Sequence, residues 1–307
     1  MGNIVSIVRV KGSAENVGRS ILEALELAEF RFPSAVKSVA IKPNLAYYWD
    51  AATGYTTDPR VVAAIIDIVR EKCSGEVDIK VVEADASAMR TKYAFKVLGY
   101  EKLAEEKKVE LFNLSKDVLE EKTVQVDKRE ITFKVPQSLL NVDLFINVPK
   151  LKLMRVVKIT CAMKNIFGCI GKPRKVVYHP ILNEAVVGIN KILRPNLTVV
   201  EGLVASDRFP IKLNLIMASA DPFSVDWIAS QIMGYKPSSV KFLKIAMKEK
   251  IGNPEGIVTR GESIKEFAKI FPREGLISTS SLWNLQFCLL KAYKKIVGDI
   301  IPPMFEE

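Results

Sequence analysis

Hydrophobic residues recur along the chain at two spacings, one typical of buried strands and one typical of amphipathic helices. Short runs rich in apolar and β-branched residues predict strands at 3–10, 36–42, 78–84, 108–113 and 143–148. Apolar residues three or four positions apart predict helices at 14–29, 59–69, 88–107 and 181–193. Because strands and helices alternate, this part of the chain predicts a parallel sheet covered by helices.

One segment departs from this alternation. Around residues 122–135 apolar and polar side chains alternate on both sides of the polar turn Asp127-Lys128-Arg129-Glu130, which predicts an antiparallel hairpin. Farther along, the same spacings predict strands near 197–201 and 213–219, and helices at 222–235, 238–250, 262–270 and 280–298.

These elements predict an α/β fold: a mostly parallel open sheet, covered by helices on both faces, with a hairpin addition near 122–135. We expect residues 1–307 to form one α/β domain, or two lobes over 1–140 and 141–307 that flank a cleft. The amphipathic 280–298 helix is expected to pack on its own domain, although its apolar side also fits a membrane surface.

The charge of the chain is basic and is concentrated in one stretch. The chain has 45 Lys and Arg against 35 Asp and Glu, a formal net charge of +10. No acidic residue lies between Asp143 and Glu184, a stretch that contains Lys150, Lys152, Arg155, Lys158, Lys164, Lys172, Arg174 and Lys175. This concentration favours a specific anion site over a generally solvated basic surface.

Other features of composition narrow the class of protein. The four cysteines (Cys73, Cys161, Cys169 and Cys288) form no CxxC pair, so we expect buried reduced thiols and no zinc or iron–sulfur site. No apolar run reaches eighteen residues and no signal peptide opens the chain, so we expect a cytoplasmic protein without a membrane span. One histidine, four glutamines and many lysines and glutamates are typical of thermophilic proteins.

Two predicted strands end alike, in VAIKPNL at 39–45 and in FINVPKLK at 145–152. Ligands of open α/β sheets gather beyond the carboxyl ends of strands. We therefore expect a cationic cleft built from residues 42–58 and 147–179, with one rim formed by Lys42, Asn44, Asn147, Lys150 and Lys152. The loop 45–57, with Tyr47, Tyr48, Trp49 and Gly54, is expected either to cover this site as a mobile segment or to pack on its neighbours.

The next segment is rich in groups that suit an anion. Thr160, Lys164 and Asn165 supply hydroxyl, ammonium and amide donors for phosphate or carboxylate oxygens. A helix over 158–166 would place Thr160 and Lys164 on one face. The spacing of Gly168 and Gly171 allows a turn whose N–H groups face an anion. Neither a P-loop pattern nor a GxGxxG fingerprint is present, which argues against those nucleotide sites.

Two further residues are candidates for proton transfer. His179, the one histidine of the sequence, follows the basic stretch and can act as acid or base near neutral pH, although a single histidine can also be structural. Asp226 lies within an otherwise apolar predicted helix. We expect its carboxylate to pair with a lysine of the site; a metal ligand or a simple salt bridge are the alternatives.

The chain resembles the domain-of-unknown-function family 362 from the second strand to about residue 250. The resemblance is carried, in order, by IKPNL (41–45), TTDPRVVAAII (56–66), FINVPKLK (145–152), ITCAMKNIFG (159–168), VVEGL (199–203) and ASADPFSVDWIASQIMG (218–234). It implies an α/β fold with a site that carries Lys42, Asn44, Thr56, Lys150, Lys152, Thr160, Lys164, Asn165 and Asp226.

The sequence departs from this family at three places. Relatives usually read PKLKTH, whereas Leu153-Met154 stand here in place of the Thr-His pair, so a role of that histidine is lost or moved to His179. Many relatives carry a ferredoxin-like module with CxxCxxCxxxC repeats, which we do not find, so we expect no cluster. The family's VVDG pattern has Glu201 in place of aspartate.

Two functions remain open at this point. The first is an enzyme that acts on a small phosphorylated or polycarboxylated anion. Lys42, Lys150, Lys152 and Lys164 would hold the anion, and Asn44, Thr56, Thr160 and Asn165 would orient it. His179 or Asp226 would then transfer protons. The second is an RNA- or ribosome-binding protein that uses the same basic surface, with Tyr47, Tyr48 and Trp49 stacking on bases. An electron-transfer protein lacks the cysteine ligands.

Overall fold

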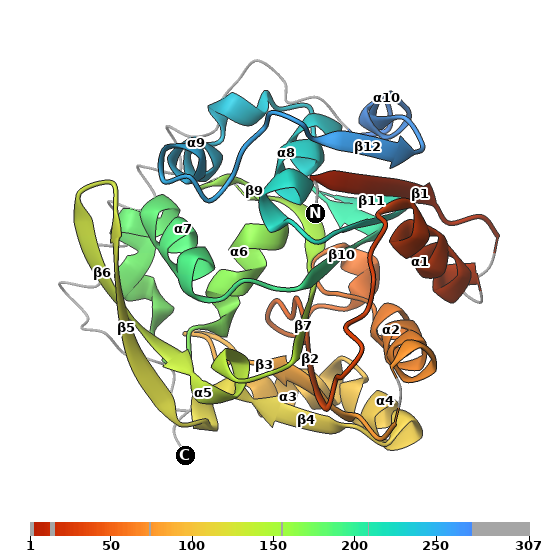
Figure 1. The fold of residues 1–307 in the computed structure, drawn as a ribbon, viewed down its shortest axis with the longest axis horizontal. Coiled ribbons are helices and arrows are strands. Elements are labelled where there is room, and N and C mark those ends of the chain that lie inside the picture. Colours follow the sequence, from red (N-terminus) through yellow and green to blue (C-terminus); the bar gives the residue numbers. More distant parts are fainter. Residues whose placement is uncertain (1–2, 13–15, 74, 155, 208, 272–307) are drawn as a thin grey trace. The chain divides into compact units, whose positions relative to one another are not determined.

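A mixed ten-stranded sheet runs through the part of the chain that the computed structural model describes, which is residues 3–12, 16–73, 75–154, 156–207 and 209–271 (Figure 1). Eight strands lie in the order β12 (Val258–Gly261), β1 (Ile4–Arg9), β11 (Pro210–Ser219), β10 (Leu197–Ser206), β7 (Leu144–Val148), β2 (Ser38–Pro43), β3 (Asp78–Glu83) and β4 (Glu110–Asn113). β8 (Lys150–Met154) also pairs with β10, and β9 (Lys158–Thr160) pairs with β8. Only β11 with its two neighbours and β9 with β8 run antiparallel within this described sheet, so the sheet is mostly parallel, as predicted.

Helices cover both faces of the sheet, because successive side chains of a strand point to opposite faces. Ile41 of β2 packs in one core with residues of α1 (Asn16–Leu27), α2 (Pro59–Lys72), α3 (Thr91–Val97) and α4 (Tyr100–Lys107). Its neighbour Ala40 belongs to a second core, together with residues of α6 (Ala162–Ile166), α7 (Leu182–Ile192), α8 (Pro222–Ile232) and α9 (Lys241–Lys248). The two cores confirm the predicted α/β fold with helices on both faces (Figure 1).

Two helices begin as their sequences predict. The side chain of Asp58 accepts a hydrogen bond from the backbone N–H of Arg60, and Pro59 occupies the first turn of α2. Asp221 caps α8 in the same way, through the N–H groups of Phe223 and Ser224. A side-chain oxygen at this position satisfies N–H groups that have no partner within the helix.

The predicted hairpin is β5 (Leu119–Val126) with β6 (Arg129–Pro136), a separate two-stranded antiparallel sheet. Its turn residues Asp127 and Lys128 both have positive φ angles, 46° and 66°. Phe133 of β6 lies against Gly188 of α7, where an added Cβ would stand 3.0 Å from the ring. The hairpin therefore adds a layer outside α7, on one side of the main sheet (Figure 1).

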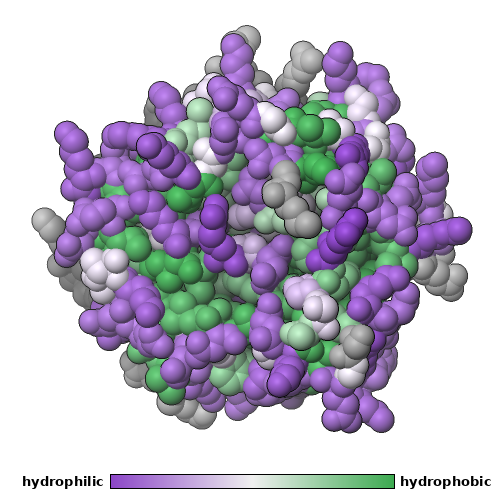
Figure 2. Space-filling view, in the orientation of Figure 1, coloured by the Kyte–Doolittle hydropathy of each residue, from purple (hydrophilic) through white to green (hydrophobic). Residues whose placement is uncertain are grey.

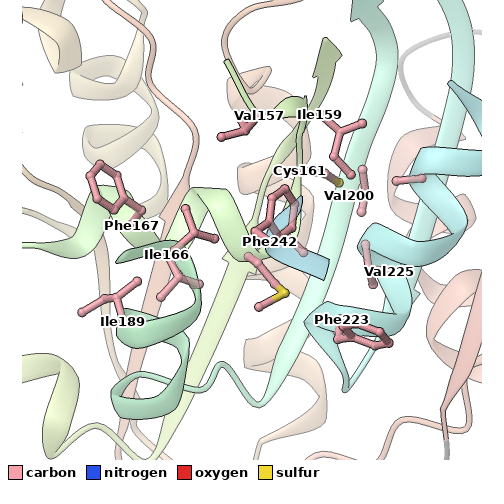
Figure 3. Packing of buried hydrophobic residues seen from close by; sticks show 14 of the residues in the cluster. Val157, Ile159, Cys161, Ile166, Phe167, Ile189, Val200, Phe223, Val225 and Phe242 are labelled. Atoms are coloured by element: carbon pink, nitrogen blue, oxygen red, sulfur yellow. The ribbon is translucent and has the colours of Figure 1, made fainter. Parts of the chain in front are cut away.

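The short helix α6 rests on a densely packed part of the second core. Ile166 of α6 and the adjacent Phe167 belong to the same hydrophobic cluster as Ile189 of α7, Val200 of β10 and Phe242 of α9 (Figure 3). All five side chains are at most 4% exposed. Because such packing leaves little freedom, the polar residues on the other side of α6 are held in fixed positions.

Some elements differ from the predictions. The predicted helix at 88–107 is divided into α3 and α4 at Gly99, whose φ is +80°. Residues 158–160 form β9 and α6 begins only at Ala162, so Thr160 and Lys164 do not share a helix face as a helix over 158–166 would require. Residues Lys158, Ile159 and Thr160 are extended because they pair with β8, a contact that the local sequence does not indicate. β8 and β12 were not predicted, since strands this short carry little periodicity.

Contacts group residues 1–271 into one unit. The sheet takes strands from both sides of residue 140, and the two-lobe arrangement stays a prediction. The predicted 280–298 helix and Cys288 lie outside the described residues. No helix of the described part combines the length and apolarity that a bilayer crossing requires. Figure 2 shows hydrophilic side chains around the rim of one face, with hydrophobic residues between them.

Two smaller helices complete the described fold. α5 (Gln137–Leu140) follows the hairpin, and α10 (Ile264–Ala268) follows β12. They contribute Leu139 and Phe267 to the second core. Lys42, Glu83 and Asn147, which stand where β2, β3 and β7 end, are themselves buried.

Candidate functional site

The carboxyl ends of three strands meet at one edge of the sheet. β2 and β7 are parallel, with Lys42 opposite Asn147 and Pro43 opposite Val148. β3, which is parallel to β2 on its other side, ends at Glu83. The similar sequences VAIKPNL and FINVPKLK therefore end side by side, which is the arrangement expected from their pattern.

Two lysines at this edge form buried ion pairs, and we call Lys42 and Lys150 the paired lysines. The Nζ atom of Lys42 lies 2.7 Å from Oε1 of Glu83 and donates to the carbonyl oxygen of Pro43, also at 2.7 Å. Lys150 pairs with Glu201, which stands opposite it in the β8–β10 pairing. Both lysines are 1% exposed. Such a partner offsets much of the cost of burying an ammonium group.

A chain of amide groups connects the edge to α6. Nζ of Lys152 donates to Oδ1 of Asn44 at 2.5 Å and to the carbonyl oxygen of Tyr55 at 2.8 Å. Nδ2 of Asn44 donates to Oδ1 of Asn165 at 2.9 Å. Nδ2 of Asn165 donates in turn to Oδ1 of Asn147 at 2.8 Å. The predicted residues Lys152, Asn44 and Asn165 are thus one hydrogen-bonded set.

Three other lysines, Lys152, Lys164 and Lys175, have no carboxylate within 4 Å among the described residues; we call them the lysine cluster. Burial, and then the charges of Lys164 and Lys150, lower the pKa of Lys152 to about 7. Burial, followed by the charges of Lys175 and Lys42, lowers the pKa of Lys164 to about 8. Burial also lowers the pKa of Lys175 to about 8. The charge of Lys164 thus acts on Lys152 and that of Lys175 acts on Lys164, whereas the Glu83 carboxylate opposes the shifts of Lys152 and Lys175.

Lys164 is the most accessible member of the cluster, since it is half-buried whereas Lys152 and Lys175 are buried. Its Nζ atom lies 4.4 Å from the centroid of the Phe167 ring. Nζ of Lys175 donates to the carbonyl oxygen of Asp85, two residues beyond the end of β3. Neither group satisfies its charge with an anion in the described part of the chain.

The two glycines of the segment do not form the predicted N–H turn. Gly168 lies against the paired Lys42, because an added Cβ would stand 3.3 Å from its Nζ atom. The N–H of Gly171 donates to the carbonyl oxygen of Lys134 in β6 at 3.0 Å. Gly168 therefore allows a close approach to the Lys42–Glu83 pair, and Gly171 fixes the loop to the hairpin.

Asp226 is fully buried on α8 and caps α6 from outside. Its carboxylate accepts hydrogen bonds from the N–H groups of Ala162 at 2.7 Å and Met163 at 2.9 Å. Burial raises its pKa to about 7, although these bonds oppose the shift. No ion pair of Asp226 occurs within the described residues, so the expected pairing with a lysine is wrong. Its role in proton transfer stays a prediction.

The remaining predicted residues occupy different places. Thr56 is buried in the loop after β2, and Oγ1 of Thr160 donates to Sδ of Met154 at 3.4 Å. His179 is exposed in the 3-10 segment Lys175–Ile181. Partial burial and the nearby charge of Lys164 lower its pKa. His179 is thus near the lysine cluster, and its catalytic role also stays a prediction.

A pocket of about 310 Å³ lies beside the Lys150–Glu201 pair. Of the predicted anion-binding residues it includes Thr56 and Lys150. Its charged lining is mixed rather than cationic and consists of Asp50, Asp58, Arg60, Lys150 and Glu201. The pocket is therefore distinct in character from the lysine cluster.

Hydrogen bonds tie the charges of this pocket together. Glu201 accepts from the backbone N–H of Asp58 at 3.1 Å, and the guanidinium of Arg60 donates to the Asp58 carboxylate. Burial would raise the pKa of Asp58, but the bonds with Arg60 hold it below its ordinary value. Sequence reasoning missed these pairings of Asp58 and Glu201.

The loop 45–57 forms one wall of the pocket and packs on β10. Gly54 has a φ of +78°, and an added Cβ would stand 2.3 Å from the carbonyl oxygen of Ala205. Trp49 packs edge-on against Tyr55, with ring centroids 4.6 Å apart. Tyr47 and Trp49 remain about half exposed, at 50% and 48%. The loop thus contacts its neighbours, which is the second of the two predicted arrangements.

The cysteines and acidic residues of the described part offer no metal centre. Cys73, Cys161 and Cys169 are buried free thiols, and burial raises the pKa of each. No group of three or more His, Cys, Asp or Glu side chains within the described residues could hold a metal ion.

Comparison with known proteins gives the family. Over 135 residues the chain is 27% identical to the thylakoid-associated protein sll1697 of Synechocystis sp.. The matched segment covers 39% of this chain and 41% of that relative's length. Among solved structures, a Thermotoga maritima protein matches with a TM-score of 0.41 and 14% identity, over 67% of this chain and 54% of that one. The lactate racemase apoprotein of Thermoanaerobacterium thermosaccharolyticum matches with a TM-score of 0.42 and 12% identity, over 71% and 54%. The family model described as "Domain of unknown function (DUF362)" matches residues 39–231, and the chain belongs to this family.

Proposed function

We propose that the protein is an enzyme that binds a small phosphorylated or polycarboxylated anion at the lysine cluster. One observation carries the proposal: in the described part of the chain no carboxylate lies within 4 Å of Lys152, Lys164 or Lys175, whereas the neighbouring paired lysines have one each. Cations gathered in a poorly solvated site repel one another, and an anion between them would remove that repulsion.

The donors of the cluster suit oxygen-rich ligands. The Lys164 ammonium contacts the face of the Phe167 ring rather than an acceptor, so its N–H groups can reach a ligand. Lys152 is oriented by Asn44, and Asn44 is oriented by Asn165. A preorganised set of donors of this kind stabilises negative charge that develops on a substrate during reaction.

Burial favours a small ligand over a nucleic acid. A polymer backbone contacts side chains that project from a surface, but Lys152 and Lys175 are at most 8% exposed. The exposed aromatic rings of Tyr47 and Trp49 could stack on bases, so RNA binding remains the alternative that the test below must distinguish.

His179 is the favoured residue for proton transfer. It is exposed at the surface, and partial desolvation, followed by the charge of the nearby Lys164, lowers its pKa and so increases the fraction of neutral imidazole near neutral pH. Asp226 is enclosed behind α6 and already engaged by two backbone N–H groups. We therefore assign Asp226 to positioning of α6, and His179 to acid–base chemistry.

Calorimetric titration with pyrophosphate and citrate tests the proposal. The wild-type chain should bind at least one of them stoichiometrically, and Lys164→Met should weaken that binding. Lys172→Met is the matched control, because Lys172 is an exposed lysine of the adjacent loop with the same charge. Equal binding by wild type and Lys164→Met would overturn the assignment. Binding of poly(U) that falls steeply with salt, with no binding of either small anion, would favour the RNA alternative.

A further inference from the structure

We propose that the pocket beside the Lys150–Glu201 pair binds a small aliphatic amine that also carries an uncharged oxygen acceptor, such as an amino-acid amide. This ligand differs in charge from the anion proposed for the lysine cluster, so the inference does not depend on the proposed function. The pocket measures about 310 Å³, which is at the lower end of the range for small-molecule sites.

The buried end of the pocket offers hydrogen-bond donors. Lys150 and Thr56 line the pocket and are each 1% exposed. Within the described residues the Lys150 ammonium donates only to Glu201, although an ammonium has three N–H groups. The Thr56 hydroxyl accepts from the N–H of Ala46 at 3.4 Å, and its own O–H has no acceptor in the part of the chain that the structure describes. These unused donors favour an oxygen acceptor on the ligand.

That acceptor should be uncharged. The Glu201 carboxylate, which is fully buried, already faces the Lys150 ammonium. A second carboxylate on the same ammonium would lie near Glu201 and be repelled by it, and the repulsion is strong away from water. A carbonyl or hydroxyl oxygen accepts the same hydrogen bond without that repulsion.

The solvent end of the pocket carries a carboxylate without a cationic partner. Asp50 and Arg60 line this end and are exposed. The Arg60 guanidinium is paired with Asp58 at 2.5 Å, whereas Asp50 forms no ion pair within the described residues and accepts a hydrogen bond from the N–H of Ala52. The lining holds three carboxylates and two cations, a formal charge of −1. Asp50 can therefore receive the ammonium group of a ligand.

Apolar side chains line the pocket as well, among them Leu98, Leu203 and Val204. Leu203 and Val204 are neighbours in β10, and successive side chains of a regular strand point to opposite faces. The register with β11 shifts between Gly202 and Val204, and this irregularity allows both side chains to line the pocket. A short aliphatic group on the ligand would be buried against these side chains.

Calorimetric titration with leucinamide tests the inference, with isocaproamide and isocaproate as comparison ligands. Leucinamide has an ammonium, a carbonyl oxygen and a branched aliphatic chain; isocaproamide lacks the ammonium, and isocaproate has a carboxylate in place of the amide. The titration is done at about pH 6, below the pKa of an α-amino group, so that leucinamide is a cation. We expect the affinity to fall in the order leucinamide, isocaproamide, isocaproate. Equal affinities, tighter binding of isocaproate or no binding of leucinamide would overturn the inference.

Two variants separate the parts of the site. Asp50→Asn should weaken leucinamide binding about two- to fivefold, as expected for a partly exposed ion pair, and leave isocaproamide binding unchanged. Glu23→Gln is the matched control, because Glu23 is an exposed carboxylate of α1 outside the pocket lining. Ala52→Trp adds a large side chain at an exposed position of the lining and should abolish the binding of both ligands. Full affinity in Ala52→Trp would show that the ligands bind elsewhere and would contradict the inference.

Citrate distinguishes this pocket from the lysine cluster. Leucinamide and citrate should bind the same chain independently, and Lys164→Met should leave leucinamide affinity unchanged. If citrate displaces leucinamide, the pocket belongs to the anion site and the inference fails. If leucinamide binds as expected while neither citrate nor pyrophosphate binds, the inference holds and only the proposed function fails.

Discussion

The paired lysines and the lysine cluster lie at the same edge of the sheet and differ mainly in their counter-charges. Lys42 and Lys150 each face a buried glutamate across an ion pair. Lys152 and Lys175 are buried almost as deeply, yet within the described residues they donate only to amide or carbonyl oxygens. Lysines with a carboxylate partner and lysines without one therefore have different roles at this edge of the sheet.

A lysine that is paired with a carboxylate of the protein contributes to stability, because removing either partner leaves the other charge buried without a counter-charge. A lysine that the protein leaves without a counter-charge is a candidate for ligand binding, because functional sites concentrate groups with displaced pKa values. Variants of the two groups should therefore differ in stability and in anion binding.

Glu83→Gln should lower the free energy of unfolding by about 3–5 kcal/mol, since it leaves the Lys42 ammonium buried without its partner. Urea denaturation at pH 7 measures this change. The double variant Lys42→Met, Glu83→Gln should recover part of the loss, because it removes the stranded charge. A loss below about 1 kcal/mol would mean that the pair is hydrated or dispensable.

The stability of the wild-type chain should rise with pH above about 7 because of the cluster. Lys152 binds its proton more weakly in the folded chain, with a pKa of about 7 against 10.5. The unfolded chain therefore holds more protons between these values, and the free energy of unfolding rises with pH across that window, by an amount on the order of a few kcal/mol. Denaturation of wild type and Lys152→Met between about pH 7 and 9.5 measures the effect, and equal slopes would refute it.

Lys164→Met should change the free energy of unfolding by less than about 1 kcal/mol, because it strands no partner and its side chain still fits beside Phe167. The same variant should weaken citrate or pyrophosphate binding roughly tenfold or more, as expected for a lost charge-assisted hydrogen bond. Weaker anion binding with little loss of stability would assign Lys164 to ligand binding. A severe loss of stability would show instead that Lys164 stabilises the fold, as the paired lysines do.

Trp49→Ala should have the smallest effect. Trp49 is about half exposed and contacts Tyr47 and Tyr55, so its loss should cost about 1 kcal/mol or less. Citrate affinity should not change, because the ring is not part of the lysine cluster. RNA binding that disappears in this variant, measured by fluorescence anisotropy, would favour the alternative function.

Much of the fold could be predicted because its signals are local. The apolar runs of β2 and β7, the Asp58-Pro59 start of α2 and the alternation of the hairpin each depend on neighbouring residues. β8 and β9 were missed because pairing with a distant strand, rather than their own periodicity, determines strands of five and three residues.

The candidate site could be predicted only in part. Strand ends that share a sequence pattern correctly indicated that Lys42 lies beside Asn147 and that Lys152 lies beside Asn44. The partners Glu83 and Glu201 were missed, since they lie 41 and 51 residues from their lysines and meet them only through sheet pairing. A signal was present: each glutamate directly follows an apolar strand run, KVVE or TVVE, where an unpaired carboxylate would be unfavourable.

The same reasoning explains the error about Asp226. Its position in an apolar helix correctly indicated a buried carboxylate with a partner. The sequence gives no sign that the partner is the N-terminal backbone of α6 rather than a lysine, since that contact spans 64 and 63 residues.

Lys152 and Lys164, which have no carboxylate within 4 Å in the described part of the chain, should gain a close counter-charge when an anion binds. Nuclear magnetic resonance of chains with ¹³Cε-labelled lysine, with assignments from Lys152→Arg and Lys164→Met, measures their pKa values directly. We expect pKa values of about 7 and about 8, each rising when citrate or pyrophosphate is added. Values near 10.5 that do not respond to either anion would contradict the account.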